Sequence, residues 1–189
     1  MIRSDPSYRG MIIIGYPGIG KSTIANQYVE IIDFESSFFN NSGKKVNDWY
    51  KIYISQAISL AEQGYIVCIS SHEDVCFELS KYINDNPDHS FEVVTITPSL
   101  SLEKQWIGKL HERYIHEKTD KNLRAFERAS KYYISDIQTV TNYTDFHHIH
   151  ITSMNYQLRF MVKDLSSMFN TNTKRHINRG KGYLNYETR

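Results

Sequence analysis

The stretch from Gly15 to Ser22 reads GYPGIGKS and fills every fixed position of the pattern G-x-x-x-x-G-K-[ST]. It follows the apolar run 11–14 and precedes a segment compatible with a helix. Three glycines let the backbone curl so that successive N–H groups face phosphate oxygens, and the N-terminal end of the next helix adds positive potential. This feature predicts a strand–loop–helix unit that binds the phosphates of a nucleoside triphosphate.

Two side chains of this phosphate loop carry chemistry of their own. The Lys21 ammonium is expected to reach the β- and γ-phosphates, and the Ser22 hydroxyl to ligate Mg²⁺. ATP and Mg²⁺ are therefore the expected cofactors. A glycine-rich turn that matches by chance is the alternative, which the flanking strand and helix patterns disfavour. The expected nucleotide-binding residues are Gly15, Pro17, Gly18, Ile19, Gly20, Lys21, Ser22 and Thr23.

The composition is that of an ordinary globular domain. The 189 residues are 40% hydrophobic and 23% charged, which suits one domain with a full core. A net charge of +1 gives no reason to expect strong attraction to nucleic acid or to an anionic membrane. We therefore expect a small-molecule nucleotide substrate as the partner, with the oligomeric state left open. Cys68 and Cys76 read as buried thiols, and without a secretory or membrane-length run we expect a cytoplasmic protein.

Strand-like apolar runs alternate with helix-like ones along the chain, which predicts an α/β fold with a central five-stranded parallel sheet flanked by helices. The expected strands are 11–14, 31–33, 65–70, 91–97 and 149–152. The expected helices are 21–30, one over 52–61 stopped by Gly64, one over 75–83, two within 99–142 broken near Thr119-Asp120, and 158–169. We expect residues 1–170 to form the domain and residues 171–189 a basic, solvated tail.

Several motifs of other phosphate-loop proteins are missing. Ser70-Ser71-His72 follows the third strand and Thr97-Pro98 ends the fourth, so neither strand supplies the terminal aspartate typical of motor-type ATPases. The guanine-reading motif Asn-Lys-x-Asp does not occur, which disfavours a GTPase switch. The acidic strand end is instead Asp33, with Glu35 two residues later.

On these residues the chain resembles the nucleoside and nucleotide kinases of the adenylate-kinase-like P-loop family, including small phage-type nucleotide kinases. The likeness is specific over Gly15–Thr23 and covers the order of elements over most of the chain. It implies an ATP-dependent phosphotransferase, foremost a nucleoside (deoxy)monophosphate kinase that forms the diphosphate. It also implies an acceptor-binding segment over about 34–63 and a helical lid over about 104–128.

In the acceptor segment, Asp33 is expected either to organise the water ligands of Mg²⁺ or to accept a hydroxyl proton. A capping carboxylate is its structural alternative. Trp49 and Tyr50 are expected to stack on an acceptor base, and core packing is at least an equal alternative. Glu35, Ser71 and His72 complete the expected acceptor contacts, although His72 can also simply open the next helix.

The expected lid carries arginines on both sides of its break. Arg113, Arg124 and Arg128 are candidates to stabilise the charge of the transferring phosphoryl group. The alternative is a solvated hairpin whose glutamates pair with these bases. His147, His148 and His150 read as surface or edge-strand histidines rather than a metal site.

Two other functions stay open at this point. One is a P-loop kinase of another acceptor, such as a nucleoside or sugar hydroxyl or a nucleic-acid end. The other is a nucleotide-binding protein without transfer chemistry, which the intact Lys21-Ser22 pair and the lid arginines disfavour.

Overall fold

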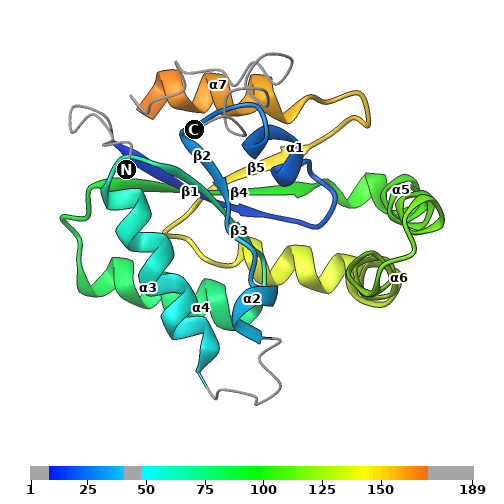
Figure 1. Cartoon of the computed structure of the whole chain (residues 1–189), viewed down its shortest axis with the longest axis horizontal. Helices are drawn as coiled ribbons and strands as arrows, with labels where there is room; N and C mark the ends of the chain where they lie inside the picture. The colour runs from blue at the N-terminus through cyan, green and yellow to red at the C-terminus, as the bar shows by residue number, and fades with distance from the viewer. Residues whose placement is uncertain (1–8, 41–47, 170–189) are drawn as a thin grey trace, which may run out of the picture.

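The computed structural model describes residues 9–40 and 48–169. Within these ranges the strands form one parallel sheet in the order β2-β3-β1-β4-β5 (Figure 1), which confirms the expected fold class. The strands are β1 (Gly10–Gly15), β2 (Ile31–Asp33), β3 (Ile66–Ser70), β4 (Phe91–Pro98) and β5 (His147–Ile151).

Helices cover both faces of the sheet, as Figure 1 shows with α1 and α7 on one side and α3 and α4 on the other. The helices are α1 (Lys21–Ala25), α2 (Ser37–Asn40), α3 (Trp49–Glu62), α4 (Glu73–Asp85), α5 (Glu103–His116), α6 (Asp120–Thr141) and α7 (Leu158–Phe169), with a short 3₁₀ helix at Leu100–Leu102. None of the helices in the described ranges is long and apolar enough to cross a membrane.

The alternation of side chains along β1 divides the core into two layers. Met11 and Ile13 pack with the residues of α1 and α7, whereas Ile12 and Ile14 pack with those of α3 and α4. All four side chains are completely buried. A strand that is covered on both faces needs apolar residues at every position, which explains the continuous run that marked it in the sequence.

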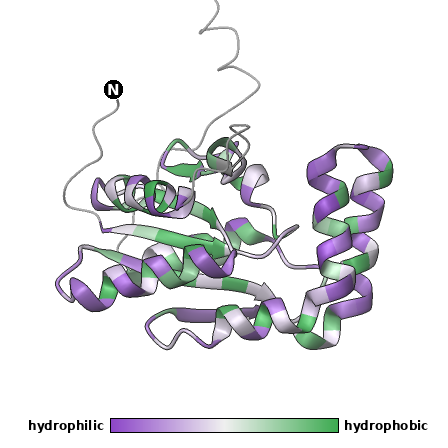
Figure 2. Cartoon of the chain, turned by 90° about the horizontal axis from the view of Figure 1, so that it is seen from below, coloured by the Kyte–Doolittle hydropathy of each residue, from purple (hydrophilic) through white to green (hydrophobic). Residues whose placement is uncertain are grey.

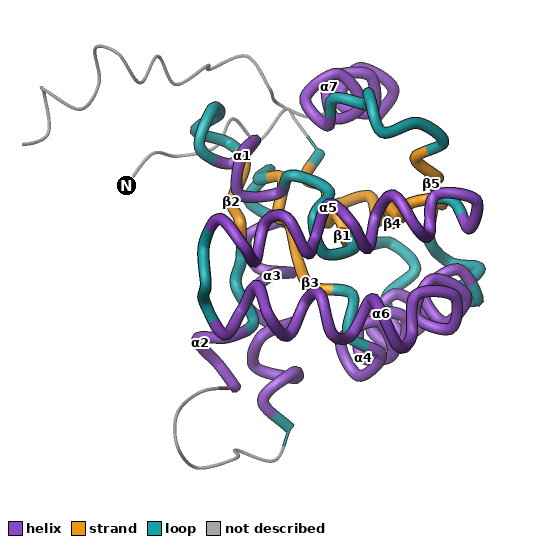
Figure 3. Tube along the Cα trace, turned by 90° about the vertical axis from the view of Figure 1, so that its right-hand side faces the viewer, coloured by secondary structure: helices purple, strands orange, loops and turns teal. Residues whose placement is uncertain are grey.

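The helices α5 and α6 form a hairpin at the carboxyl ends of the strands. The two helices stand beside each other and project from the body of the molecule (Figure 2), and they run across the strand ends (Figure 3). Their connection is capped by Thr119, whose hydroxyl accepts from the Asn122 N–H, so the predicted helix break is confirmed. The base of the hairpin is not loose, because Trp106 and Leu110 belong to the core and are at most 1% exposed.

The elements differ from the sequence prediction at several places. The helix expected over 21–30 ends at Ala25, because the chain must turn back at once to enter β2. The short α2 is absent from the prediction. The fifth strand begins at His147 rather than at residue 149, since its first residues pair with Val94 and Thr95 of β4. The predicted basic tail, 171–189, lies outside the described residues.

Candidate functional site

The phosphate loop joins the end of β1 to the start of α1, and its glycines meet two different demands. Gly18 and Gly20 have φ values of 87° and 103°, a region that side chains rarely occupy. Gly15 is needed for space, because a Cβ there would lie 2.8 Å from Cδ of Lys21 and 2.5 Å from Cδ1 of Ile19. A side chain at Gly18 or Gly20 would therefore strain the backbone, and one at Gly15 would force the side chains of Ile19 and Lys21 to shift.

The side chain of Lys21 lies across its own loop. Its Nζ donates a 2.5 Å hydrogen bond to the carbonyl oxygen of Gly15. Burial lowers the pKa of Lys21, and the carboxylate of Asp33 opposes that shift by favouring the charged form. An ammonium in such surroundings gains more from a phosphate anion than it would in open solvent.

A direct hydrogen bond links the loop to the end of β2. Ser22 Oγ donates to Asp33 Oδ2 at 2.5 Å. The other carboxylate oxygen, Asp33 Oδ1, is buried and has no hydrogen-bond partner in the described part of the chain. A hydroxyl beside a carboxylate is the oxygen donor set that Mg²⁺ prefers, and an unpartnered buried oxygen is costly without a ligand. The residues expected to serve magnesium are thus brought together and fit that ion.

A second unpartnered oxygen lies on the neighbouring strand. Ser70 ends β3 opposite Gly15 of β1, and its hydroxyl is buried without a hydrogen-bond partner. Its backbone N–H is satisfied by the hydroxyl of Tyr53. The sequence prediction names Ser71 and His72 instead of Ser70. The signal that marks Ser70 is its position as the last residue of the strand adjacent to the loop.

The predicted acceptor residues Trp49 and His72 lie together. Their rings meet edge to face with centroids 6.0 Å apart, and Trp49 also packs 5.8 Å from Tyr53. His72 precedes α4 as its N-cap residue, with Ser71 half-buried beside it. Burial lowers the pKa of His72, and the positive charge of Arg128 acts in the same direction. Trp49 is therefore partly a packing residue, but it also contacts His72, which lies two residues beyond the end of β3.

Tyr50 is engaged elsewhere. Its hydroxyl donates a 3.1 Å hydrogen bond to Asp48 at the exposed start of α3. The pKa of Tyr50 is raised by this bond. The structure thus places Trp49 with His72 but directs the polar end of Tyr50 to its own helix terminus.

Glu35 pairs with a lysine of the hairpin. Lys121, in the first turn of α6, forms an ion pair with the Glu35 carboxylate. Both charges lie close enough to Lys21 to act on its pKa. The tip of the hairpin therefore meets the segment after β2 beside the phosphate loop.

The three predicted lid arginines have different surroundings. Arg128 is held by Asp136, through Nε–Oδ2 at 2.7 Å and Nη2–Oδ1 at 2.8 Å. Its positive charge contributes to the pKa of Tyr16 and of His72, although burial is the larger cause in both. Arg124 is exposed and donates from Nε to the Asp120 carbonyl at 3.3 Å. Arg113 is half-buried on α5 and lowers the pKa of Lys109, although burial of that lysine is the larger cause.

The histidines of β5 bond to the neighbouring strand. His148 Nδ1 lies 2.6 Å from Thr95 Oγ1, and His150 Nδ1 lies 3.0 Å from Thr97 Oγ1. His147 faces Glu92 at 3.6 Å. In the described ranges, 9–40 and 48–169, no cluster of histidine, cysteine, aspartate and glutamate could hold a metal ion. Both cysteines are buried and free there, with the pKa of each thiol raised by burial to about 12.

No family model matches the chain, and no curated protein matches it in sequence. Two solved structures are similar in fold. A sulfotransferase from Alicyclobacillus acidocaldarius aligns with a TM-score of 0.53 at 9% identity, covering 90% of this chain and 84% of its own. A shikimate kinase from Bacteroides thetaiotaomicron aligns with a TM-score of 0.50 at 12% identity, covering 85% of this chain and 97% of its own. The fold is thus P-loop kinase-like.

Proposed function

We propose that this chain is an ATP- and Mg²⁺-dependent phosphotransferase that acts on a small-molecule acceptor. The observation that carries the proposal is the bond from Ser22 to Asp33 together with the unpartnered Asp33 Oδ1. A phosphate loop alone predicts nucleotide binding, whereas a loop hydroxyl joined to a strand-end carboxylate also supplies a magnesium site.

Each part of the site has a role in this proposal. The loop N–H groups bind the phosphates of ATP, and Lys21 stabilises the negative charge that spreads over the transferred group. Ser22 would ligate the magnesium ion directly, and Asp33 would hold its water ligands. When bound, the ion neutralises phosphate charge. The hairpin excludes water, which would otherwise compete as an acceptor.

A nucleoside monophosphate is the acceptor that the resemblance to nucleotide kinases implies. Its support in the structure is the half-buried ring of Trp49 beside His72 at the strand ends, where an acceptor base can stack. Arg128, fixed by Asp136, presents a positive charge to the same region and suits an acceptor phosphate.

A hydroxyl acceptor is the second candidate, and Glu35 favours it. This carboxylate lies near Lys21, two residues beyond the magnesium-site Asp33. A carboxylate beside the acceptor oxygen repels a phosphate but can receive the proton of an alcohol. One of the similar structures is, by its name, a kinase of shikimate, and the other is a sulfotransferase. The third candidate function is nucleotide binding without transfer chemistry.

An acceptor screen tests the proposal and separates these candidates. Purified protein is incubated with Mg·ATP and, one at a time, ribo- and deoxynucleoside monophosphates, nucleosides and sugars, and ADP release is measured. Release that depends on one acceptor supports transfer and assigns the class. If the protein binds ATP but releases no ADP in response to any class of acceptor, a nucleotide-binding protein without transfer chemistry would be favoured.

The lid proposal is tested separately. We expect residues 112–128 to gain protection from hydrogen exchange when an analogue spanning both substrates binds, and at least one of Arg113→Ala, Arg124→Ala and Arg128→Ala to lose activity. Because Trp106 and Leu110 are core residues, the protection should begin beyond them. No added protection together with full activity in all three variants would make the hairpin a rigid structural element.

A further inference from the structure

Two side chains from distant parts of the sequence hold consecutive carbonyl groups of the phosphate loop. Trp106 of α5 donates from Nε1 to the carbonyl oxygen of Pro17 at 2.9 Å. Tyr156, in the connection between β5 and α7, donates from its hydroxyl to the carbonyl oxygen of Gly18 at 3.2 Å. Two side-chain donors from distant elements thus satisfy the carbonyls of two adjacent peptides of the loop.

The two donors form one unit with a lysine. The rings of Trp106 and Tyr156 stack with centroids 5.7 Å apart and an interplanar angle of 22°. Nζ of Lys109 lies 4.4 Å from the Trp106 ring centre and 4.9 Å from that of Tyr156. It also donates a 3.0 Å hydrogen bond to the Tyr156 hydroxyl. A charged donor polarises the Tyr156 hydroxyl, which strengthens the hydrogen bond from this hydroxyl to the Gly18 carbonyl.

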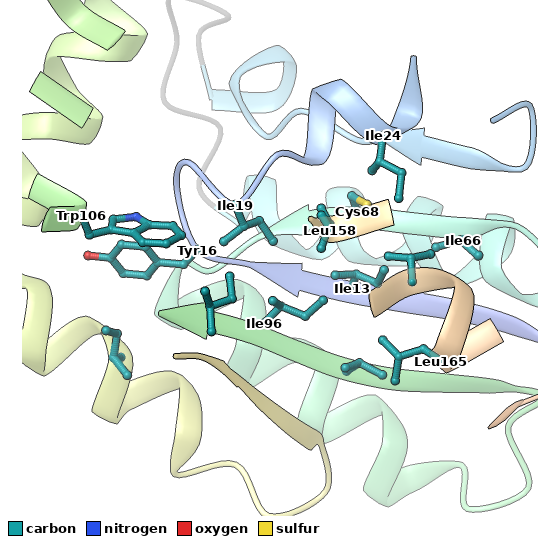
Figure 4. Packing of buried hydrophobic residues seen from close by; sticks show 14 of the residues in the cluster. Ile13, Tyr16, Ile19, Ile24, Ile66, Cys68, Ile96, Trp106, Leu158 and Leu165 are labelled. Atoms are coloured by element: carbon teal, nitrogen blue, oxygen red, sulfur yellow. The ribbon is translucent and has the colours of Figure 1, made fainter. Parts of the chain in front are cut away.

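Close packing of α5 on the loop accompanies these bonds. A Cβ added to Gly18 would lie 2.9 Å from Cδ2 of Leu110 and 3.5 Å from Nε1 of Trp106. Trp106 is completely buried and lies beside Tyr16 and Ile19 of the loop (Figure 4). The loop is therefore seated against the first helix of the hairpin.

The direction of a carbonyl fixes the direction of the next N–H. In a trans peptide the C=O and the following N–H point to opposite sides. Holding the carbonyls of Pro17 and Gly18 toward the aromatic pair therefore turns the N–H groups of Gly18 and Ile19 away from it. The Ile19 N–H makes only a long 3.4 Å bond to the Tyr16 carbonyl, so it stays free to bind a stronger acceptor. Burial raises the pKa of Tyr156, which keeps its hydroxyl a donor.

We propose that Trp106 and Tyr156 are positioning residues, which orient the phosphate-binding N–H groups by hydrogen-bonding to the loop carbonyls. Lys109 connects Tyr156 to α5 through its own hydrogen bond to the Tyr156 hydroxyl. The proposal rests on the proposed function in that phosphate is the ligand of the loop. A shift of α5 would then change the conformation of the loop, so a movement of the hairpin would be coupled to the phosphate site.

The first test needs no ligand. Tyr156→Phe removes one oxygen and keeps the ring. Tyr114→Phe is the matched control, because Tyr114 is a half-buried tyrosine of α5 whose hydroxyl makes no hydrogen bond with the described residues. We expect hydrogen exchange of the Gly18 and Ile19 amides to rise on the order of 5-fold in Tyr156→Phe, the effect of one hydrogen bond. The melting temperature should stay close to that of wild type. Unchanged exchange of these amides would overturn the proposal.

The second test separates positioning of the loop from contact with a base. Binding of ATP and of inorganic tripolyphosphate is measured for wild type, Tyr156→Phe and Trp106→Phe. The proposal predicts that each variant weakens both ligands by a similar factor, since the loop amides serve phosphate. Weaker ATP binding with unchanged tripolyphosphate binding would contradict it. If wild type bound neither ligand, the proposed function would fail, while the exchange experiment would still decide the role of Tyr156.

Discussion

Lys121 in the first turn of α6 forms an ion pair with Glu35, two residues beyond β2, and the pair lies next to the loop lysine Lys21. The two partners are 86 residues apart in sequence. Their contact brings a hairpin cation to the place where a phosphoryl group would be transferred. It also places a positive charge beside the Glu35 carboxylate.

We expect Lys121→Met to lower turnover on the order of 10-fold or more while changing ATP affinity less, because the lost charge acts mainly on the transferring group. Lys131→Met is the matched control, since Lys131 is an exposed lysine of the same helix and is not part of the proposed site. Steady-state kinetics with the acceptor identified by the screen provide the measurement. Equal turnover in both variants and wild type would remove Lys121 from the reaction.

Lys21→Ala should nearly abolish phosphoryl transfer and leave the fold intact. The ammonium bonds to the Gly15 carbonyl rather than to a core group, so its loss costs little stability. Losing a preorganised charge of this kind commonly lowers the rate on the order of 100-fold or more. Turnover and the melting temperature are both measured. Near-normal turnover would mean that the loop takes no part in the chemistry.

Asp33→Asn should lower the catalytic rate more than it weakens ATP binding. The amide can still accept the Ser22 hydroxyl bond, but it carries no charge to hold the water ligands of magnesium. The concentration of Mg²⁺ needed for half-maximal activity should rise. If turnover, ATP affinity and Mg²⁺ dependence all matched wild type, Asp33 would be a structural residue only.

Gly108→Ala should stabilise the protein by roughly 0.5–1 kcal/mol. Gly108 lies inside α5, and a Cβ there meets nothing within 4 Å. Gly64→Ala is the contrasting variant. Gly64 has a φ of 87°, so its replacement should destabilise the protein. Chemical denaturation gives both free energies of unfolding. A destabilised Gly108→Ala protein would show that α5 needs this glycine for a bend or a movement.

The sheet and the phosphate loop were predictable because their signals are local. Continuous apolar runs mark β1 and most of β3, and the loop pattern requires its glycines by backbone geometry. The stop at Gly64 was predictable for the same reason, and its N–H does bond to the Ala61 carbonyl. The length of α1 could not be predicted from the sequence, because the tight return into β2 overrides helix propensity.

The side-chain contacts around the loop could not be predicted, since they join residues far apart in sequence. Trp106 reaches Pro17 across 89 residues, and Tyr156 reaches Gly18 across 138. Nothing in the local pattern distinguishes Trp106 from any other buried aromatic residue on an amphipathic helix. Lys121 lies within the segment predicted as the lid, but its pairing with Glu35 is seen only in the fold.

The most direct test of phosphoryl transfer follows the γ-phosphoryl group of ATP itself. ATP labelled in that group is incubated with Mg²⁺, the protein and a mixture of small molecules, and the labelled products are separated. Wild type should place the label in one organic product, and Lys21→Ala should leave it in ATP. Label that appears only as inorganic phosphate, or that stays in ATP with wild type, would contradict a phosphotransferase.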